Sequence, residues 1–291
     1  MDVKARIERA LEKAVDNAVA RSNPPRLTAA IRYAMFPPGA RLRPRLCLGV
    51  AGACGDDRPE LTNAAASAIE MLHCASLIHD DMPCFDDAAI RRGKPTLHIA
   101  FDEPLALLAG DALIVLAFQT LARVAGAGDA LDRLPRLLSV VSDSVGMPDG
   151  IVAGQAWEGE ADPDLAQYHR AKSGALFAGS TMAGAAAAGR DPAPWATLGL
   201  RLGEAYQVID DIRDVTGDAA SLGKPTGQDA ALDRPNAVEE LGMEGAIARF
   251  DALVAEGLDS MPDCPGRAPL RVLIINETNR FLPEDRSIGA A

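Results

Sequence analysis

Two acidic clusters lie 130 residues apart in the sequence: DDMPCFDD, which begins at Asp80, and DDIRD, which begins at Asp210. Pro83 should end the apolar helix that leads into the first cluster, so that Asp86 can turn back toward Asp80. In the second cluster, Asp210 and Asp214 are four residues apart and therefore share one helix face. Each cluster thus predicts carboxylates gathered at the end of a helix.

Carboxylates held this close repel one another unless a cation lies between them. Oxygen ligands suit a hard cation, and Mg²⁺ prefers one or two carboxylates together with water and phosphate oxygens. Cys and His are not clustered in this sequence, which argues against zinc. Either cluster alone is more often a solvated acidic helix end, and it is the pair that favours a magnesium site.

Basic clusters alternate with the acidic ones along the chain. Arg41 and Arg43 stand in PGARLRP, at a junction between a loop and a helix that is a natural anion site. The other clusters contain Arg91 and Arg92 in RRGKP, Lys172 in AKSG, and Lys224 in GKPTGQD. Each cation alone would be a solvated surface charge. The alternation indicates that Mg²⁺ and diphosphates bind between the acidic and basic groups.

His73 precedes Asp80 by seven residues, which is two helical turns on the same face. A lone His on an apolar helix is more often a core group with its hydrogen bonds satisfied. Its alignment with Asp80 favours a role facing the ligand.

These motifs are carried by a chain in which helical periodicity dominates and no run alternates as a strand. The breaks between helices are short, and no linker is long or polar enough to separate two domains. We therefore expect one all-α domain spanning residues 1–291. The helices are expected at about 2–21, 26–35, 44–54, 59–82, 103–124, 130–146, 149–160, 164–188, 194–215, 236–260 and 267–281.

Charge and composition exclude several classes of protein. The net charge of −12 argues against a nucleic-acid binder, which needs a basic surface. The charged first twenty residues predict an amphipathic helix rather than a signal peptide. The longest apolar stretch, residues 105–118, is broken by Asp111, so we expect no integral membrane segment. The five scattered cysteines indicate free thiols in a reducing compartment, which predicts a cytoplasmic protein.

In this combination of motifs the sequence resembles the short-chain isoprenyl diphosphate synthases. The motifs PGARLRP, HCASLIHDDMPCFDDAAIRRGKPTLH, GQAWE, AKSGALF, YQVIDDIRD and GKPTGQD occur in that family's order and span nearly the whole chain. The closest resemblance is to the geranylgeranyl diphosphate synthases of bacterial carotenoid and photopigment pathways. It implies the isoprenoid synthase fold, a helical bundle with a central cavity, and a homodimer.

The resemblance also implies a role for each motif residue. Asp80, Asp86 and Asp210 would bind three Mg²⁺ ions around the allylic diphosphate, with Asp81, Asp211 and Asp214 in support. Arg91, Lys172 and Lys224 would hold the allylic diphosphate. Isopentenyl diphosphate would be held by Arg43, His73 and Arg92. Gln207 would face the reacting centre. The implied reaction is ionisation of the allylic diphosphate followed by attack of the isopentenyl double bond, with no side-chain nucleophile.

Two departures from the family pattern stand out. Ala40 occupies a position where the family usually has a Lys that contacts isopentenyl diphosphate. Losing one charge-assisted hydrogen bond costs about 1.5–3 kcal/mol, which is roughly 10- to 150-fold in affinity. Arg41 or Arg45 could compensate. The second departure is Arg234-Pro235-Asn236, where Lys-x-Thr is usual but the charge survives.

Small residues near the first cluster bear on product length. Ser76 lies one turn before Asp80, and Ala75 stands where farnesyl-producing relatives tend to have an aromatic residue. A floor further along, near Met71 or Leu72, would admit one more prenyl unit and predicts the C20 product. A core alanine with a floor made by another helix would leave C15 open.

Three other functions compete with this interpretation. A class I terpene cyclase or a squalene-type synthase would not need an isopentenyl site, so Arg43, His73 and Arg92 argue against both. A non-catalytic partner subunit of another synthase is suggested by Ala40 alone. The intact metal-binding aspartates argue against it.

Overall fold

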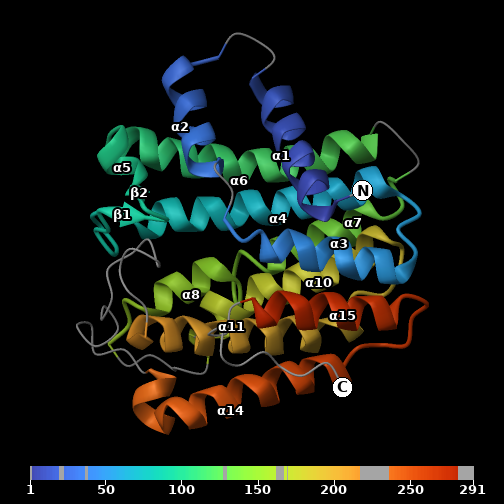
Figure 1. The fold of residues 1–291 in the computed structure, drawn as a ribbon. Helices are drawn as coiled ribbons and strands as arrows, with labels where there is room; N and C mark the ends of the chain where they lie inside the picture. Colours follow the sequence, from blue (N-terminus) through green and yellow to red (C-terminus); the bar gives the residue numbers. More distant parts are fainter. Residues whose placement is uncertain are drawn as a thin grey trace.

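The computed structural model describes residues 2–19, 23–36, 39–126, 130–161, 167–168, 170–216 and 236–280; the side chains of Ala125, Asp214 and Thr216 are outside this description. The predicted all-α class is confirmed (Figure 1). The helices are α1 (Val3–Val19), α2 (Pro25–Met35), α3 (Leu42–Cys54), α4 (Pro59–Asp80), α5 (Leu97–Ala100), α6 (Glu103–Gly126), α7 (Leu134–Asp143), α8 (Ile151–Trp157), α10 (Ala175–Ala187), α11 (Ala196–Thr216), α14 (Ala237–Asp259) and α15 (Arg267–Asn279).

The structure differs from the predicted elements in three places, the first of which is the short helix α5, which was not predicted. The helix expected over 164–188 is a π-helical turn, η1 (Arg170–Gly174), followed by α10. A strand pair that the sequence pattern did not predict, β1 (Ile90–Arg91) and β2 (Lys94–Pro95), forms a tight antiparallel hairpin. Its two turn residues, Arg92 and Gly93, both have positive φ, which matches a two-residue hairpin turn. Two paired residues per strand are too few to show as alternation.

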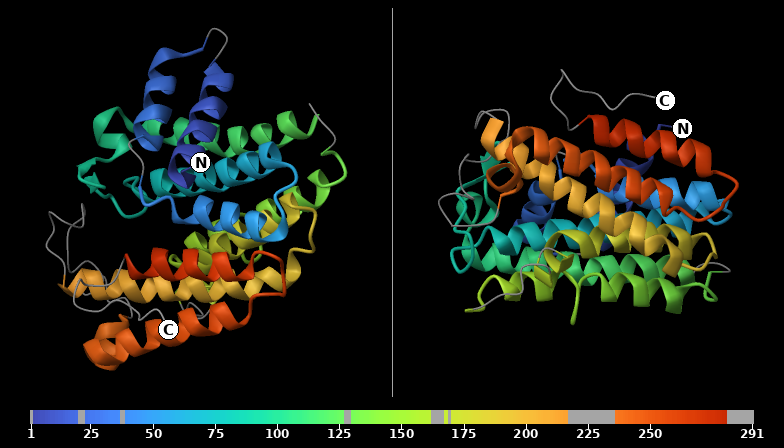
Figure 2. Two further views of the ribbon diagram at one scale, coloured as in Figure 1. Left: turned by 45° about the vertical axis from the view of Figure 1, so that its right-hand side comes forward. Right: turned by 90° about the horizontal axis from the view of Figure 1, so that it is seen from below.

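The helices enclose two hydrophobic clusters. The first gathers side chains mainly from α1, α2, α4, α6 and α7, and the second from α3, α11, α14 and α15. Helix α10 contributes to both, and it lies between α4 and α11 in the views of Figures 1 and 2. The 22-residue helix α4 is buried along most of its length, so its C-terminal end is held firmly where the first acidic cluster begins.

Close approach of helices replaces bulky aromatic side chains in this core. A Cβ atom added to Gly184 of α10 would come within 2.3 Å of the carbonyl oxygen of Cys47 in α3. A Cβ added to Gly199 of α11 would come within 2.4 Å of Cα of Ala178 in α10. Small residues therefore let α10 pack closely against α3 and α11.

Helix α6 is long and apolar enough, by length and composition, to cross a membrane, so the expectation that Asp111 rules this out is wrong by that criterion. A core helix of a soluble protein passes the same test, and α6 packs along α4. Its outward side leaves Leu107, Leu108 and Val115 about half exposed. The apolar composition of α6 therefore comes from two faces, one packed against α4 and one exposed at the surface.

Candidate active site

The first acidic cluster forms a turn at the end of α4. The helix ends at Asp80, and the backbone N–H of Asp86 donates to the carbonyl oxygen of Asp80 at 3.0 Å. The predicted return of Asp86 toward Asp80 is thereby confirmed. Pro83 lies within the turn, where its missing N–H costs nothing.

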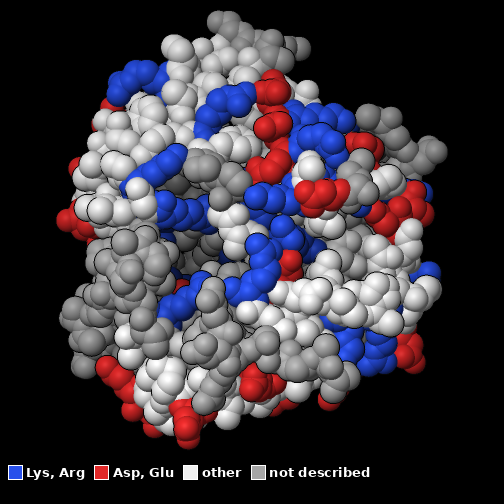
Figure 3. Space-filling view, viewed as in Figure 1, with Lys and Arg blue, Asp and Glu red and all other residues white. Residues whose placement is uncertain are grey.

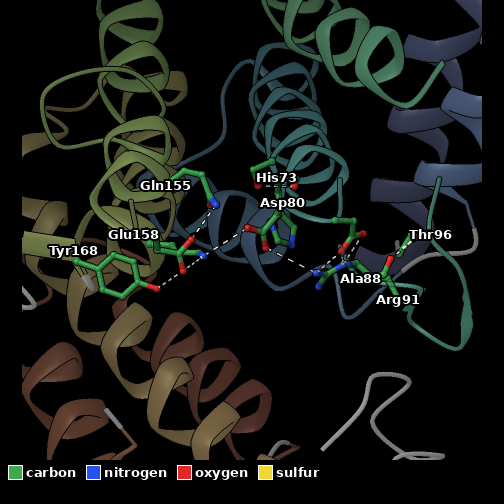
Figure 4. A network of polar contacts seen from close by, with 11 residues as sticks. His73, Asp80, Ala88, Arg91, Thr96, Gln155, Glu158 and Tyr168 are labelled. Carbon is green, nitrogen blue, oxygen red and sulfur yellow. Dashed lines mark hydrogen bonds and ion pairs between the residues drawn. The ribbon is translucent and has the colours of Figure 1, made fainter. Parts of the chain in front are cut away.

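Asp80 lies between two cations (Figure 4). The Lys172 Nζ atom is 3.5 Å from Asp80 Oδ1, and an Arg91 Nη atom is 3.8 Å from Asp80 Oδ2. Asp80 Oδ1 is buried and accepts no hydrogen bond. Burial raises the pKa of Asp80 above its usual value, although the charges of Lys172 and Arg91 oppose that shift.

Asp81 is turned away from this gap and contacts the hairpin. Its carboxylate accepts two hydrogen bonds from Arg91 Nε, at 2.6 and 2.8 Å. Burial works against the charged form of Arg91, but the hydrogen bond and charge of Asp81 outweigh it and raise the Arg91 pKa. Arg91 thus links the hairpin to the acidic turn through Asp81. Its contact with Asp80 is longer, at 3.8 Å.

Lys172 is held by a group of residues to which the sequence analysis assigned no role. Glu158 Oε1 lies 2.5 Å from Lys172 Nζ and also accepts a hydrogen bond from the Tyr168 hydroxyl at 2.6 Å. The Gln155 side-chain amide donates to Glu158 Oε2 at 2.8 Å. The signal was present in GQAWE, which contains Gln155 and Glu158 three residues apart.

His73 and Arg43 meet a short distance along α4. The Arg43 Nη1 and His73 Nε2 atoms are 3.2 Å apart. Burial lowers the pKa of Arg43 from its usual value. Burial, reinforced by the charges of Arg43, Arg92, Arg91 and Arg41, holds the pKa of His73 well below 6.5. His73 is therefore neutral at pH 7 and can accept a hydrogen bond from Arg43.

Arg41 and Arg45 are both engaged by carboxylates, which argues against the expected compensation for Ala40. Arg41 is buried and contacts Glu8 Oε1 at 2.9 Å and Glu70 Oε1 at 2.6 Å. Arg45 contacts Glu277 Oε1 at 2.7 Å. Arg41 cannot turn to a ligand beside Ala40 without leaving the buried Glu70 unpaired, whereas Glu277 would keep its contact with Arg280 at 3.2 Å.

Arg92 lies at the hairpin turn and makes no hydrogen bond or ion pair with the described residues. Its guanidinium packs on the loop before α3: a Cβ atom on Gly39 would come within 2.7 Å of Arg92 Cζ. The absence of a side chain at Gly39 therefore lets two of the predicted basic motifs touch. Lys and Arg side chains gather around a hollow near the middle of this face (Figure 3), although the net charge is −12.

The second acidic cluster ends α11, and part of it serves the fold. Asp211 is buried and accepts hydrogen bonds from the Gln207 amide at 3.0 Å and from the backbone N–H of Ala237 at 2.9 Å. Gln207 Oε1 also accepts from the Ser173 hydroxyl at 2.9 Å. Gln207 is thus tied to its neighbours, whereas the resemblance implied that it faces the reacting centre. Asp210 is partly buried, and the Asp214 side chain, Lys224 and Arg234 lie outside the described residues.

Ala75 and Ser76 occupy adjacent positions in the last turns of α4. Ala75 is almost fully buried in the first hydrophobic cluster, and the Ser76 hydroxyl donates to the carbonyl oxygen of His73. Met71 and Leu72, the predicted floor, are both fully buried. These four residues are small or apolar, and they precede Asp80 along α4.

The donor set at the acidic clusters fits Mg²⁺. All the predicted metal-binding groups are carboxylates, and Asp80 contributes a buried oxygen that no donor satisfies. Among the described residues, no three Asp, Glu, His or Cys side chains come close enough to hold a metal ion by themselves. That arrangement suits a cation that completes its coordination with water and substrate phosphate.

Comparisons with known proteins agree with this geometry. The polyprenyl synthetase family profile matches residues 24–254. The chain belongs to the polyprenyl synthetase family. Among its relatives is the geranylgeranyl diphosphate synthase of Cereibacter sphaeroides, 51% identical over 97% of this chain and 98% of the relative. A probable farnesyl diphosphate synthase of Bradyrhizobium diazoefficiens is 38% identical over 88% of this chain and 80% of the relative.

Solved structures in this family share the fold. The geranyltransferase from Helicobacter pylori, complexed with magnesium and isoprenyl diphosphate, has a TM-score of 0.75 and 31% identity. It covers 95% of this chain, and the chain covers 97% of it. The FPP/GFPP synthase from Zymomonas mobilis has a TM-score of 0.76 and 30% identity, with 95% and 99% covered. As a family member, the chain is a prenyltransferase.

Proposed function

We propose that this protein is a geranylgeranyl diphosphate synthase, which adds isopentenyl diphosphate to an allylic diphosphate until a C20 product is made. The observation that carries the proposal is that two clusters of charged and polar side chains lie next to each other along α4. One is the Asp80–Lys172–Arg91 group at the helix end, and the other is the Arg43–His73 pair two turns before it. Similarity to the named synthase of Cereibacter sphaeroides favours the C20 product.

The allylic diphosphate would bind at the end of α4. Lys172, oriented by Glu158, would contact its phosphate oxygens, and Arg91 and Lys224 would complete the cationic side. Asp80, Asp86 and Asp210, with Asp214 nearby in sequence, would hold Mg²⁺, for which we propose three ions. Bound there, Mg²⁺ would neutralise charge on the leaving diphosphate.

Isopentenyl diphosphate would bind beside the first substrate, between Arg43 and Arg92. Both guanidiniums lack a carboxylate partner among the described residues, and each lowers the pKa of the neighbouring His73. A diphosphate between them would relieve their repulsion. The allylic C–O bond would break with its electron pair leaving on diphosphate. The isopentenyl double bond would then attack the cation, and a proton would be lost to the released diphosphate.

Product length would depend on the space next to Ala75 and Ser76. A small side chain at position 75 leaves the growing tail free to pass along α4, whereas an aromatic ring would shorten the available path. We therefore propose Ala75 and Ser76 as the positions that permit C20. Farnesyl diphosphate remains the alternative product, since farnesyl synthase names occur among relatives at lower identity.

The decisive experiment incubates the purified chain with Mg²⁺, labelled isopentenyl diphosphate and farnesyl diphosphate, and sizes the product alcohols. From farnesyl diphosphate we expect the natural chain to make the C20 product. With geranyl diphosphate as the starter, we expect Ala75→Phe to make mainly the C15 product. Continued C20 synthesis by Ala75→Phe would refute the pocket assignment. Failure to elongate farnesyl diphosphate while geranyl diphosphate yields C15 would refute the C20 product. No elongation from any starter would favour a non-catalytic partner subunit, to which Ala40 points.

We further propose that the whole chain forms one catalytic domain that works as a soluble cytoplasmic homodimer in carotenoid or photopigment synthesis. The shared helix α10 supports one domain, because both hydrophobic clusters depend on it. The half-exposed apolar side chains of α6 support self-association, since apolar patches of this kind mark interaction surfaces.

A further inference from the structure

Arg43 differs from Arg41, Arg45 and Arg91, and resembles Arg92, in having no carboxylate partner among the described residues. Arg41, Arg45 and Arg91 each contact at least one carboxylate within 3 Å. Within the described part of the chain, Arg43 makes one hydrogen bond, to His73, and its Nε atom is buried without a partner. A partly buried cation without a counter-charge is costly, so another contact should stabilise this guanidinium before a ligand arrives.

An aromatic ring lies directly against it. Arg43 Cζ is 4.5 Å from the centroid of the Phe177 ring, which α10 contributes to the cavity side of the core. Phe177 is completely buried, and its ring packs against Tyr206 of α11 with centroids 5.5 Å apart. A guanidinium over a ring face is attracted most strongly where water is excluded, as it is here.

The ring contact is not a hydrogen bond, so it uses none of the N–H donors of Arg43. His73 is within hydrogen-bond distance of Nη1. Two contacts from different helices therefore restrict the position of the guanidinium, and one of them leaves its donors available to a ligand.

We propose that Phe177 is a positioning residue for isopentenyl diphosphate: its ring holds the Arg43 guanidinium with the donor edge toward the diphosphate. This inference rests on the proposed role of Arg43 as an isopentenyl diphosphate ligand. Phe177 is the last residue of the AKSGALF motif, and its place in the sequence alone indicates no role.

Phe250 of α14 provides the matched control. It belongs to the same hydrophobic cluster as Phe177, is 2% exposed, and lines the same small internal cavity of about 20 Å³. No cation lies over its ring among the described residues. Replacing either ring by Leu removes similar apolar contacts, but only Phe177→Leu removes the contact with Arg43.

The test compares Phe177→Leu, Phe250→Leu, Arg43→Met and the double variant Arg43→Met/Phe177→Leu in steady-state assays with Mg²⁺. We expect Phe177→Leu to raise the KM for isopentenyl diphosphate roughly 5- to 30-fold relative to Phe250→Leu. The KM for the allylic diphosphate, bound by Lys172, should change less than about 2-fold. In the Arg43→Met background, Phe177→Leu should add less than about 2-fold. Phe177→Met, whose flexible side chain refills the volume, serves if Phe177→Leu does not fold.

Three results would overturn the inference, and they distinguish failure of the Phe177 role from failure of the substrate site. If Arg43→Met raises the KM for isopentenyl diphosphate but Phe177→Leu behaves like Phe250→Leu, Phe177 is a core residue only. Equal increases in the KM of both substrates would lead to the same conclusion. If Arg43→Met leaves the KM for isopentenyl diphosphate unchanged, the proposed substrate site itself is wrong, and the role of Phe177 fails with it.

Discussion

Individual side chains around α4 divide into those engaged within the protein and those left available to a ligand. Asp81, Asp211 and Arg41 are buried and fully partnered, so they stabilise the turn, the α11–α14 junction and the loop before α3. Asp80 has a buried oxygen without a donor, and Arg43 has no carboxylate. Such unsatisfied groups are costly in a folded chain, which is why we propose them as binding positions.

Asp80→Asn should reduce kcat by about 10²-fold or more, because it removes a negative charge from the proposed metal site. The midpoint of thermal unfolding should not fall, since burial already disfavours the Asp80 carboxylate and raises its pKa. Asp87→Asn is the control: its side chain is 71% exposed, and Asn tolerates its φ of 46°. Normal turnover in Asp80→Asn, measured alongside the control, would contradict the assignment.

Ala40→Lys should lower the KM for isopentenyl diphosphate by about 10-fold or more, because it restores one charge-assisted hydrogen bond. The effect should be visible because Arg41 and Arg45 are held by carboxylates and do not fill the same role. Product length should stay the same. A KM equal to that of the natural chain would mean that the ligand does not pass beside position 40.

His73 should make folding sensitive to mild acid. Its folded-state pKa is lowered by burial and by the arginines of α3 and the hairpin, so the unfolded chain binds the proton first. This contribution to stability is complete above pH 6.5 and is lost as the pH falls below 6.5, by at most about 1.4 kcal/mol per pH unit. Urea unfolding at pH 5 and 7 should show a smaller pH dependence for His73→Asn. An identical dependence in both proteins would contradict this.

At the scale of elements, small residues set how closely the site-bearing helices approach. Helix α3 carries Arg43, α10 carries Phe177, and Gly184 lets these two helices touch. The π-helical turn η1 carries Lys172, whose backbone lies within 2.4 Å of where a Cβ on Gly154 of α8 would be. Close helix contacts therefore fix the distances between groups that are far apart in the sequence.

Gly184→Ala should destabilise the protein by about 1–3 kcal/mol, because the added methyl group would overlap the Cys47 carbonyl and push α3 from α10. Gly52→Ala on α3 is the control, since nothing lies within 4 Å of its added Cβ. The control should gain up to about 1 kcal/mol from lower unfolded-state entropy and better helix propensity. Urea unfolding of both variants measures the difference, and equal stabilities would refute close packing at Gly184.

For the whole molecule, the acidic net charge has a different consequence from the Lys and Arg side chains around the hollow in Figure 3. The charge of −12 disfavours binding to nucleic acids, while the local cations are suited to anionic ligands. We propose the outward side of α6 as the surface for a second copy, because Leu107, Leu108 and Val115 are exposed on one helix that also packs against α4.

Leu108→Glu should convert a dimer to a monomer, because it places a charge in the apolar surface of α6. Light scattering after size-exclusion chromatography measures the mass directly. Val272→Glu on α15, where the native side chain is 58% exposed, is the control and should not change the mass. A dimer that persists in Leu108→Glu would show that another surface forms the interface.

Sequence alone was sufficient for the helical class, the family, and the turn that returns Asp86 to Asp80, because each depends on local periodicity or on contiguous motifs. Only the tertiary structure decided which charged residues are engaged. Arg41 and Arg45 were candidates to replace a missing Lys until Glu8, Glu70 and Glu277 were found beside them. The same holds for Phe177 under Arg43 and Glu158 beside Lys172. These pairs come from different helices, and their approach is set by packing across the core, which spacing along one chain does not encode.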